Sequence, residues 1–111
     1  MDNGGMDIAT LHHLDELLED GESLTVARIS VYLATHRLAT ANWFGRTGRA
    51  ERSAWIEREG TGWRVWETDE RAGIMDHCIL RTESETEALD SFLRRARRHL
   101  KADGTAVRRI S

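Results

Sequence analysis

Residues 53–80 read SAWIEREGTGWRVWETDERAGIMDHCIL and hold three of the four tryptophans in the 111-residue chain. Short runs of apolar residues alternate there with turn signals, a pattern typical of antiparallel strands. The pattern predicts strands over residues 53–58, 63–67 and about 74–81. The glycines within 59–62 favour a hairpin loop, and residues 69–73 predict a looser second turn. The three strands would then form a meander.

The middle strand should carry a tryptophan on each of its faces, because side chains alternate across a strand. One face would present Trp63, Val65 and Glu67, and the other Arg64, Trp66 and Thr68. A sheet with one dry face needs to bury only one of these two tryptophans. The other is either a binding residue or a residue that lies under a loop.

The composition is that of a globular protein with a heavily charged surface, since 40% of the residues are hydrophobic and 32% are charged. A chain of 111 residues can build a core without a metal or a disulfide, so we expect a single domain over 1–111, with frayed ends at 1–6 and 105–111. Cys78 is the single cysteine, and no N-terminal apolar run resembles a signal peptide or a membrane span. These features predict a cytoplasmic protein.

Helices are predicted both before and after the meander in the sequence. Residues Ile8–Glu19 have apolar side chains at helical spacing, with Asp7 as a candidate cap. The start of the C-terminal helix is marked by two pairs with the spacing of a capping box, Thr82 with Glu85 and Ser84 with Glu87. Its apolar stripe consists of Leu89, Phe92, Leu93, Ala96 and Leu100. We expect this stripe to pack on the sheet.

Residues 24–40 fit two templates. Apolar residues alternate from 25 to 33 as in a strand, yet others from 24 to 41 lie on one helical stripe. The length of the segment and its helix-forming residues favour a helix over about 24–40, with Ser23 as its N-cap. Residues 42–52 contain two glycines and three arginines, which predicts an exposed connection.

The fold class that follows is α+β. We expect a three-stranded antiparallel meander packed against two N-terminal helices and one C-terminal helix.

Charge is strongly segregated beneath the net charge of −3. Residues 1–22 hold seven acidic side chains and no lysine or arginine, and residues 67–90 hold eight acidic side chains against two arginines. From Arg94 onward there are seven basic residues and one acidic residue. An acidic centre suits a basic partner and a basic tail suits an anionic one, although a solvated face or a helix dipole also explains either patch.

The sequence contains no recognisable catalytic or metal-binding constellation. The five histidines are scattered over four segments, and adjacent histidines on a helix point about 100° apart and cannot easily share an ion. His77 and Cys78 are neighbours in a predicted strand, where their side chains would diverge. We therefore expect a protein that is not an enzyme and that needs no metal or cofactor.

The order of motifs resembles that of small bacterial immunity proteins that accompany polymorphic toxins. The resemblance covers about half of the chain and consists of four elements. These are a strand with Trp55, Glu57 and Arg58; its hairpin partner with Gly62, Trp63 and Val65; a turn with Glu70, Arg71 and Gly73; and a helix start with Glu85, Glu87 and Ala88. Ala72, inserted before Gly73, departs from the pattern of the turn.

This resemblance implies that the protein binds a cognate toxin domain and neutralises it by occluding its active site. Many such toxins have basic substrate clefts, and an acidic surface would speed association with one. Tryptophan and arginine dominate the energetics of many protein interfaces. The expected contact residues, all taken to be exposed, are Trp66, Glu67, Asp69, Glu70, Arg71 and Asp76.

The alternative is a small nucleic-acid-binding or regulatory module. It would use basic residues of the C-terminal segment, namely Arg94, Arg95, Arg97, Arg98, Arg108 and Arg109. The negative net charge and the lack of aromatic residues among these arginines make nucleic acid the less favoured partner. A third possibility is a subunit that dimerises through a sheet edge.

Overall fold

The computed structural model describes residues 8–19, 24–103 and 108–109. Along this part of the chain the elements are α1 (Ile8–Glu19), α2 (Val26–Thr35), β1 (His36–Arg37), β2 (Ala41–Trp43), β3 (Ala54–Glu59), β4 (Gly62–Glu67), the 3-10 turn η2 (Asp76–Cys78), β5 (Leu80–Thr82), α3 (Glu85–Asp103) and β6 (Arg108–Arg109). The predicted α+β class is confirmed. None of the described helices is long and apolar enough to cross a membrane.

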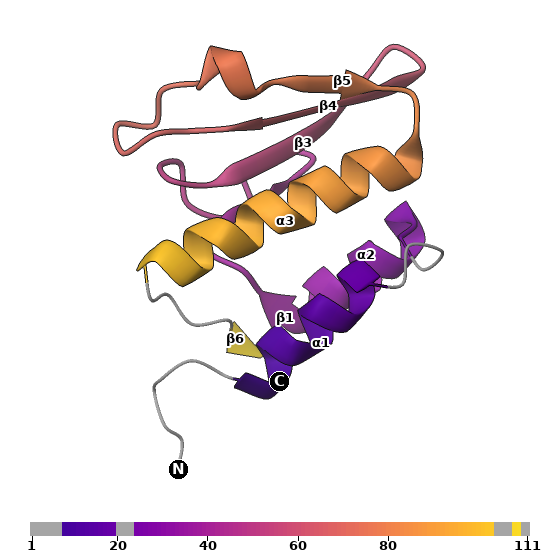
Figure 1. Cartoon of the computed structure of the whole chain (residues 1–111), viewed down its shortest axis with the longest axis vertical. Coiled ribbons are helices and arrows are strands. Elements are labelled where there is room, and N and C mark those ends of the chain that lie inside the picture. The colour runs from indigo at the N-terminus through magenta and orange to yellow at the C-terminus, as the bar shows by residue number, and fades with distance from the viewer. Residues whose placement is uncertain (1–7, 20–23, 104–107, 110–111) are drawn as a thin grey trace.

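The main sheet has the strand order β2-β3-β4-β5 and is mixed (Figure 1). Strands β3 and β4 form the predicted antiparallel hairpin, with Ile56 opposite Val65. Its two-residue loop begins at Gly60, whose φ of 61° lies in the left-handed region that glycine adopts without strain. Strand β5 continues the antiparallel ladder, with Leu80 opposite Val65.

The third strand is shorter than predicted. After the turn at 69–73, Ile74 forms an isolated bridge with Thr68, and the Met75 amide donates to the Glu67 carbonyl oxygen. The chain then leaves the ladder in η2 and rejoins it only at β5. The expected strand over 74–81 is therefore interrupted by one 3-10 turn.

Residues 24–40 are a shorter helix followed by strands, so the helix predicted over the whole segment is wrong. The Thr25 side chain caps α2 by accepting from the Arg28 amide, while the predicted cap Ser23 lies outside the described residues. Beyond Thr35 the backbone is extended, and β1 pairs with β6. Strand β2 pairs in parallel with β3, so the start of the predicted exposed connection is an edge strand.

The two ends of the chain depart differently from expectation. Helix α1 has the predicted bounds, whereas its candidate cap Asp7 and the whole of 1–6 lie outside the described residues. Arg108 and Arg109, expected to be frayed, form β6 opposite β1, with Arg109 facing His36. Residues 104–107 and 110–111 are not described.

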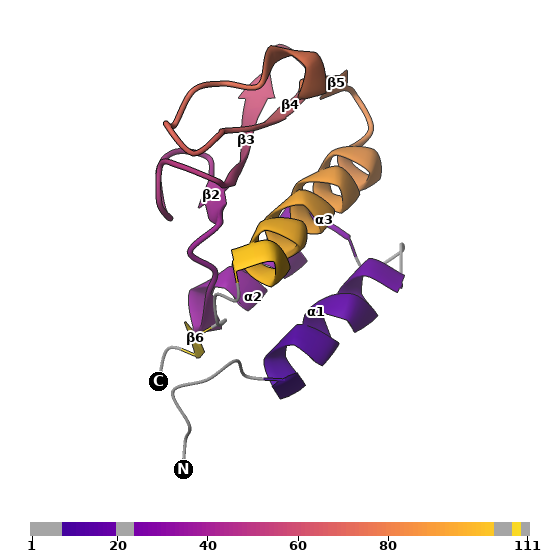
Figure 2. The ribbon, with the colours of Figure 1, turned by 60° about the vertical axis from the view of Figure 1, so that its left-hand side comes forward.

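Helix α3 is the middle layer of the molecule. It lies across one face of the sheet, and α1 and α2 pack on its other side (Figures 1 and 2). Its predicted apolar stripe, Leu89, Phe92, Leu93, Ala96 and Leu100, is completely buried. Ser84 accepts from the Glu87 amide at the start of the helix, as the capping-box spacing predicts. The face of the sheet that α3 covers is thus the core face.

Candidate partner-binding surface

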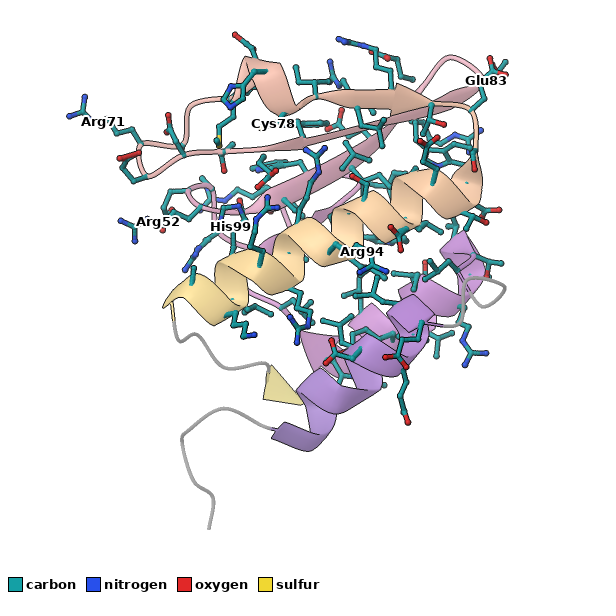
Figure 3. The ribbon with its side chains drawn as sticks, viewed as in Figure 1. Arg52, Arg71, Cys78, Glu83, Arg94 and His99 are labelled. Atoms are coloured by element: carbon teal, nitrogen blue, oxygen red, sulfur yellow. The ribbon has the colours of Figure 1, made fainter. Side chains whose placement is uncertain are left out.

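The six expected contact residues do not form one exposed surface. Trp66 and Glu67 are 7% and 3% exposed, so the expectation that they lie on the surface is wrong. Asp69 is half-buried, and three residues of the set are exposed, namely Glu70, Arg71 and Asp76. Figure 3 shows Arg71 projecting from the tip of the turn, at the same end of the sheet as Arg52.

Glu67 points into the space between the sheet and α3. Its carboxylate accepts from His99 Nε2 at 2.9 Å and from Arg98 Nη2 at 2.5 Å, and Arg95 Nη1 lies 3.3 Å away. Figure 3 shows His99 on α3, pointing toward the sheet. Burial by itself raises the pKa of Glu67, but the hydrogen bonds from His99 and Arg98 and the charges of Arg98 and Arg95 outweigh it and lower the pKa to about 2. Glu67 therefore fastens α3 to the sheet.

Asp69 shapes the second turn. Its Oδ1 accepts from the backbone amides of Arg71 and Gly73, both at 2.9 Å. The hydrogen bond from the Gly73 amide has the largest effect and that from the Arg71 amide the second largest, and both lower the pKa of the Asp69 carboxyl. Ala72, the residue that departs from the immunity-protein pattern, has a φ of 65° in this turn. Asp69 is thus a structural residue of the turn that presents Glu70 and Arg71.

The acidic stretch 67–90 is divided between opposite ends of the sheet. Glu83, Glu85 and Glu87 lie at the start of α3, beside the β3–β4 hairpin, and accept hydrogen bonds from Thr61, the Val26 amide and Thr82 respectively. Asp90 pairs with Arg94 on α3. At the end with the second turn, no described residue hydrogen-bonds or pairs with the Glu70 and Asp76 side chains. The continuous acidic surface that the sequence suggested is not formed.

The four arginines of α3 are bound to carboxylates of the same chain. Arg95 and Arg98 contact Glu67, and Arg95 also donates to the Cys78 carbonyl oxygen. Arg97 binds Asp15 of α1 through two nitrogen atoms. These ion pairs hold α3 to both of its neighbouring layers.

The sheet face opposite α3 is covered by no helix of the described chain (Figure 2). We call it the open face, and it consists of Trp55, Glu57, Glu59, Arg64, Trp66, Ile74 and Arg81. The pairing registers place these residues on one side, because opposed residues of an antiparallel pair share a face. The β2 end of this side lies beneath the 44–53 loop, where Asn42 is fully buried.

An apolar half of the open face lies beside the second turn. The rings of Trp55 and Trp66 stack with centroids 5.8 Å apart and planes 12° apart, and the Arg64 guanidinium lies 4.6 Å from the Trp66 ring centre. Trp66 is buried between these neighbours, while Trp55 is only half-buried. Ile74, opposite Thr68 in the next bridge, is 55% exposed. Trp55 and Ile74 are therefore an aromatic and an aliphatic side chain that are both accessible to solvent in this half.

The other half of the open face is a ladder of alternating charges. Arg64 contacts Glu57 at 3.4 Å and Glu59 at 3.8 Å, and Arg81 contacts Glu59 at 2.9 Å. All four side chains are partly solvent-exposed, so each pair contributes only about 0–1 kcal/mol to stability. The ladder forms a polar border to the apolar half.

Two loops fix the end of the open face beside the second turn. The Arg52 amide donates to the Asp69 carbonyl oxygen, and the Thr68 amide donates to the Ser53 carbonyl oxygen, both at 3.0 Å. The Thr68 hydroxyl also contacts Ser53 Oγ at 3.1 Å and accepts from Trp55 Nε1 at 3.4 Å. These bonds hold Trp55 and the turn in a fixed relation before any partner arrives.

Part of this surface could be predicted from strand alternation. Strand alternation placed Trp66 on the face opposite Glu67, which is correct. Glu67 shares its face with the buried Trp63 and Val65, and the expectation of an exposed Glu67 overlooked this signal. Trp55 and Ile74 were not in the expected contact set, because their place beside Trp66 depends on strand register; Trp55 was a candidate only if Trp66 proved to be a core residue. Within the described residues, no three His, Cys, Asp or Glu side chains are grouped to hold a metal ion.

Comparison of the chain with protein-family models, curated proteins and solved structures gives no match.

Proposed function

We propose that this chain is an immunity protein that binds a cognate toxin domain through the open face and neutralises it by occluding its active site. The observation that carries the proposal is Trp55, which stacks on the buried Trp66 and is partly exposed, together with the exposed Ile74, on a sheet face that no described helix covers. The similarity of residues 53–100 to immunity proteins supplies the class of partner. The proposed activity requires neither catalysis nor a cofactor.

The anatomy of the open face supports a protein partner. Aromatic side chains at the centre of a patch, surrounded by polar groups that exclude water, are typical of binding hot spots. Trp55 has few rotatable bonds and is already held by Thr68 and Trp66, so ordering it on binding costs little entropy. Trp55 therefore takes the place of Trp66 as the central contact residue of the proposed surface.

The earlier candidates take different parts in this proposal. Glu70, Arg71 and Asp76 are exposed near the apolar half and remain proposed contacts at its border. The Trp66 ring stacks on Trp55 and supports it, and Asp69 stabilises the turn through its hydrogen bonds. Their contribution to binding would be through positioning.

The nucleic-acid alternative is less favoured by the contacts of α3. Three of its arginines are engaged with Asp15 or Glu67, and a fourth pairs with Asp90. A phosphate backbone would have to displace these carboxylates. The described arginines of α3 serve the fold instead.

The test is binding of Trp55→Ala to the toxin domain, with the protein encoded beside this chain as the probe. Truncating a hot-spot tryptophan should weaken binding by about 2 kcal/mol, roughly 30-fold in Kd, mainly through faster dissociation. The matched control is Val31→Ser on α2, which removes a 68% exposed apolar side chain on the far side of α3. Its Kd should stay unchanged.

Calorimetry or surface plasmon resonance measures both variants, and thermal unfolding checks that each is folded. Equal affinity of folded Trp55→Ala and the unmodified chain would contradict the open face as the binding site. A chain that neither binds the neighbouring protein nor protects cells from it would contradict the immunity function.

A further inference from the structure

We infer that the open face fits a toxin surface with an apolar centre and charges of both signs around it, and does not fit a basic substrate cleft. This inference rests on the proposed function, because it names the kind of toxin surface that the open face would recognise. The acidic sequence had predicted a basic cleft as the partner of this protein, and the mixed charges of the open face favour a different toxin surface.

The charges of the open face are balanced. Glu57 and Glu59 alternate with Arg64 and Arg81 across three strands, in a chain of contacts of 2.9–3.8 Å. Arg64 lies over Trp66, at the border between the charged and apolar halves. A strongly basic cleft pressed onto this face would bring its cations against two arginines, and like charges at an interface oppose binding.

The described carboxylates around the apolar half are either engaged within the chain or accompanied by arginines. Glu67 is buried on the opposite face of the sheet, and Asp69 binds the amides of its own turn. Glu83 lies by the hairpin, where it lines a hollow of about 310 Å³ with Glu59 and Arg81. Around the second turn the exposed carboxylates of Glu70 and Asp76 are accompanied by Arg71 and Arg52, so neither sign of charge predominates there.

This arrangement predicts what the toxin must supply. Its surface should offer an apolar depression for Trp55 and Ile74, and it should offer both donors and acceptors to the Glu–Arg ladder. Such an interface gains most of its free energy from desolvated apolar contact, which salt does not screen. The toxin could then be blocked without any imitation of an anionic substrate.

The first arm of the test is salt dependence, with the protein encoded beside this chain as the probe. The Kd should change by less than about threefold between roughly 50 and 500 mM NaCl, because balanced charges give little net attraction to screen. A basic cleft occupied by an acidic surface would instead lose affinity steeply over that range.

The second arm uses a pair of border variants, Glu57→Gln and Arg81→Gln, whose side chains are 40% and 59% exposed. Both should weaken binding slightly, by up to about fivefold, since exposed charge pairs are worth about 0–1 kcal/mol. If the toxin surface is basic, Arg81→Gln should bind more tightly while Glu57→Gln binds more weakly. That opposite pair of effects, or steep salt dependence, would overturn the inference.

The two hypotheses fail in distinguishable ways. Loss of binding in Trp55→Ala together with tighter binding of Arg81→Gln leaves the immunity function standing and removes only the balanced-charge inference. No complex at any salt concentration removes the proposed function and the inference with it.

Discussion

Glu67 is a buried carboxylate that the fold can tolerate because three cationic or hydrogen-bonding side chains meet it from α3. Burying a charge costs several kcal/mol unless it is paired and hydrogen-bonded. Here Arg95, Arg98 and His99 come from successive turns of one helix and converge on one carboxylate. Removing a single partner would leave the buried carboxylate with weaker compensation between the two layers.

The pH dependence of stability should report this contact. The pKa of Glu67 is about 2 in the folded chain and about 4.5 ordinarily, so the folded state favours the ionised form. Its contribution is fully present above pH 4.5 and is lost as the pH falls towards 2. A shift of this size corresponds to about 3 kcal/mol. Urea unfolding of the unmodified chain at a series of pH values measures it.

Glu67→Gln should be destabilised at neutral pH and should lose most of this dependence between pH 5 and 2, because its side chain cannot ionise. Glu70→Gln, an exposed neighbour in the turn, is the control and should follow the unmodified chain. An unchanged acid profile in Glu67→Gln would show that other carboxylates govern acid unfolding.

Strand β2 shows how a short edge strand with a buried polar residue is stabilised by the loop that follows it. Asn42 donates from Nδ2 to the Arg49 carbonyl oxygen at 2.9 Å and to Ser53 Oγ at 3.1 Å, and its Oδ1 accepts from the Gly48 amide at 2.8 Å. Thr47 Oγ1 accepts from the Trp43 amide on the outer edge. The loop therefore occupies the free edge of the sheet on this side.

Gly48→Ala should disrupt this element. A Cβ at position 48 would lie 2.5 Å from the Ala39 carbonyl oxygen and 2.7 Å from that of Ala41. Both atoms are backbone, so the loop must move, at a cost of about 1–3 kcal/mol. Glu51→Ala, an exposed change in the same loop, should stay within about 0.5 kcal/mol. Chemical denaturation measures the free energy of unfolding of both variants. If Gly48→Ala were as stable as the control variant, this would contradict the tight packing of Gly48 against the backbone.

The segment 24–40 explains why element boundaries were misread. The strand-like alternation from 25 to 33 lies within α2, and extended chain begins only at His36, so the alternation did not mark a strand. No glycine or proline marks the change at Thr35. The helix gives way to strands whose partners, β6 and β3, come later in the sequence. Local propensity carries no information about such partners.

At the scale of the whole molecule, strong local signals predicted the β3–β4 hairpin, α1 and α3. The Gly60 turn and the Ser84 cap are local interactions, and α3 has an apolar stripe over several turns. The parallel strand β2 and the covering of Trp66 depend on contacts between distant segments. For the candidate surface, alternation could assign Trp66 to a face, but it could not reveal that Trp55 and Arg64 cover it.

The position of α3 between two layers leads to a prediction about cooperativity. Phe92 is fully buried on α3, and its ring centre lies 5.7 Å from that of Trp43 at the edge of the sheet. Phe92→Ala should cost about 3–5 kcal/mol, through lost burial and the cavity that remains. Lys101→Ala, an exposed change on the same helix, is the control and should have little effect.

Because α3 contacts the sheet on one side and α1 on the other, loss of Phe92 should weaken all layers together. Tryptophan fluorescence reports the sheet, which holds all four tryptophans, and far-ultraviolet circular dichroism reports mainly the helices. In a single cooperative domain the two transitions coincide, and in Phe92→Ala they should shift together to lower denaturant. Two separate transitions would mean that the helices and the sheet fold independently, which would contradict the single domain expected over 1–111.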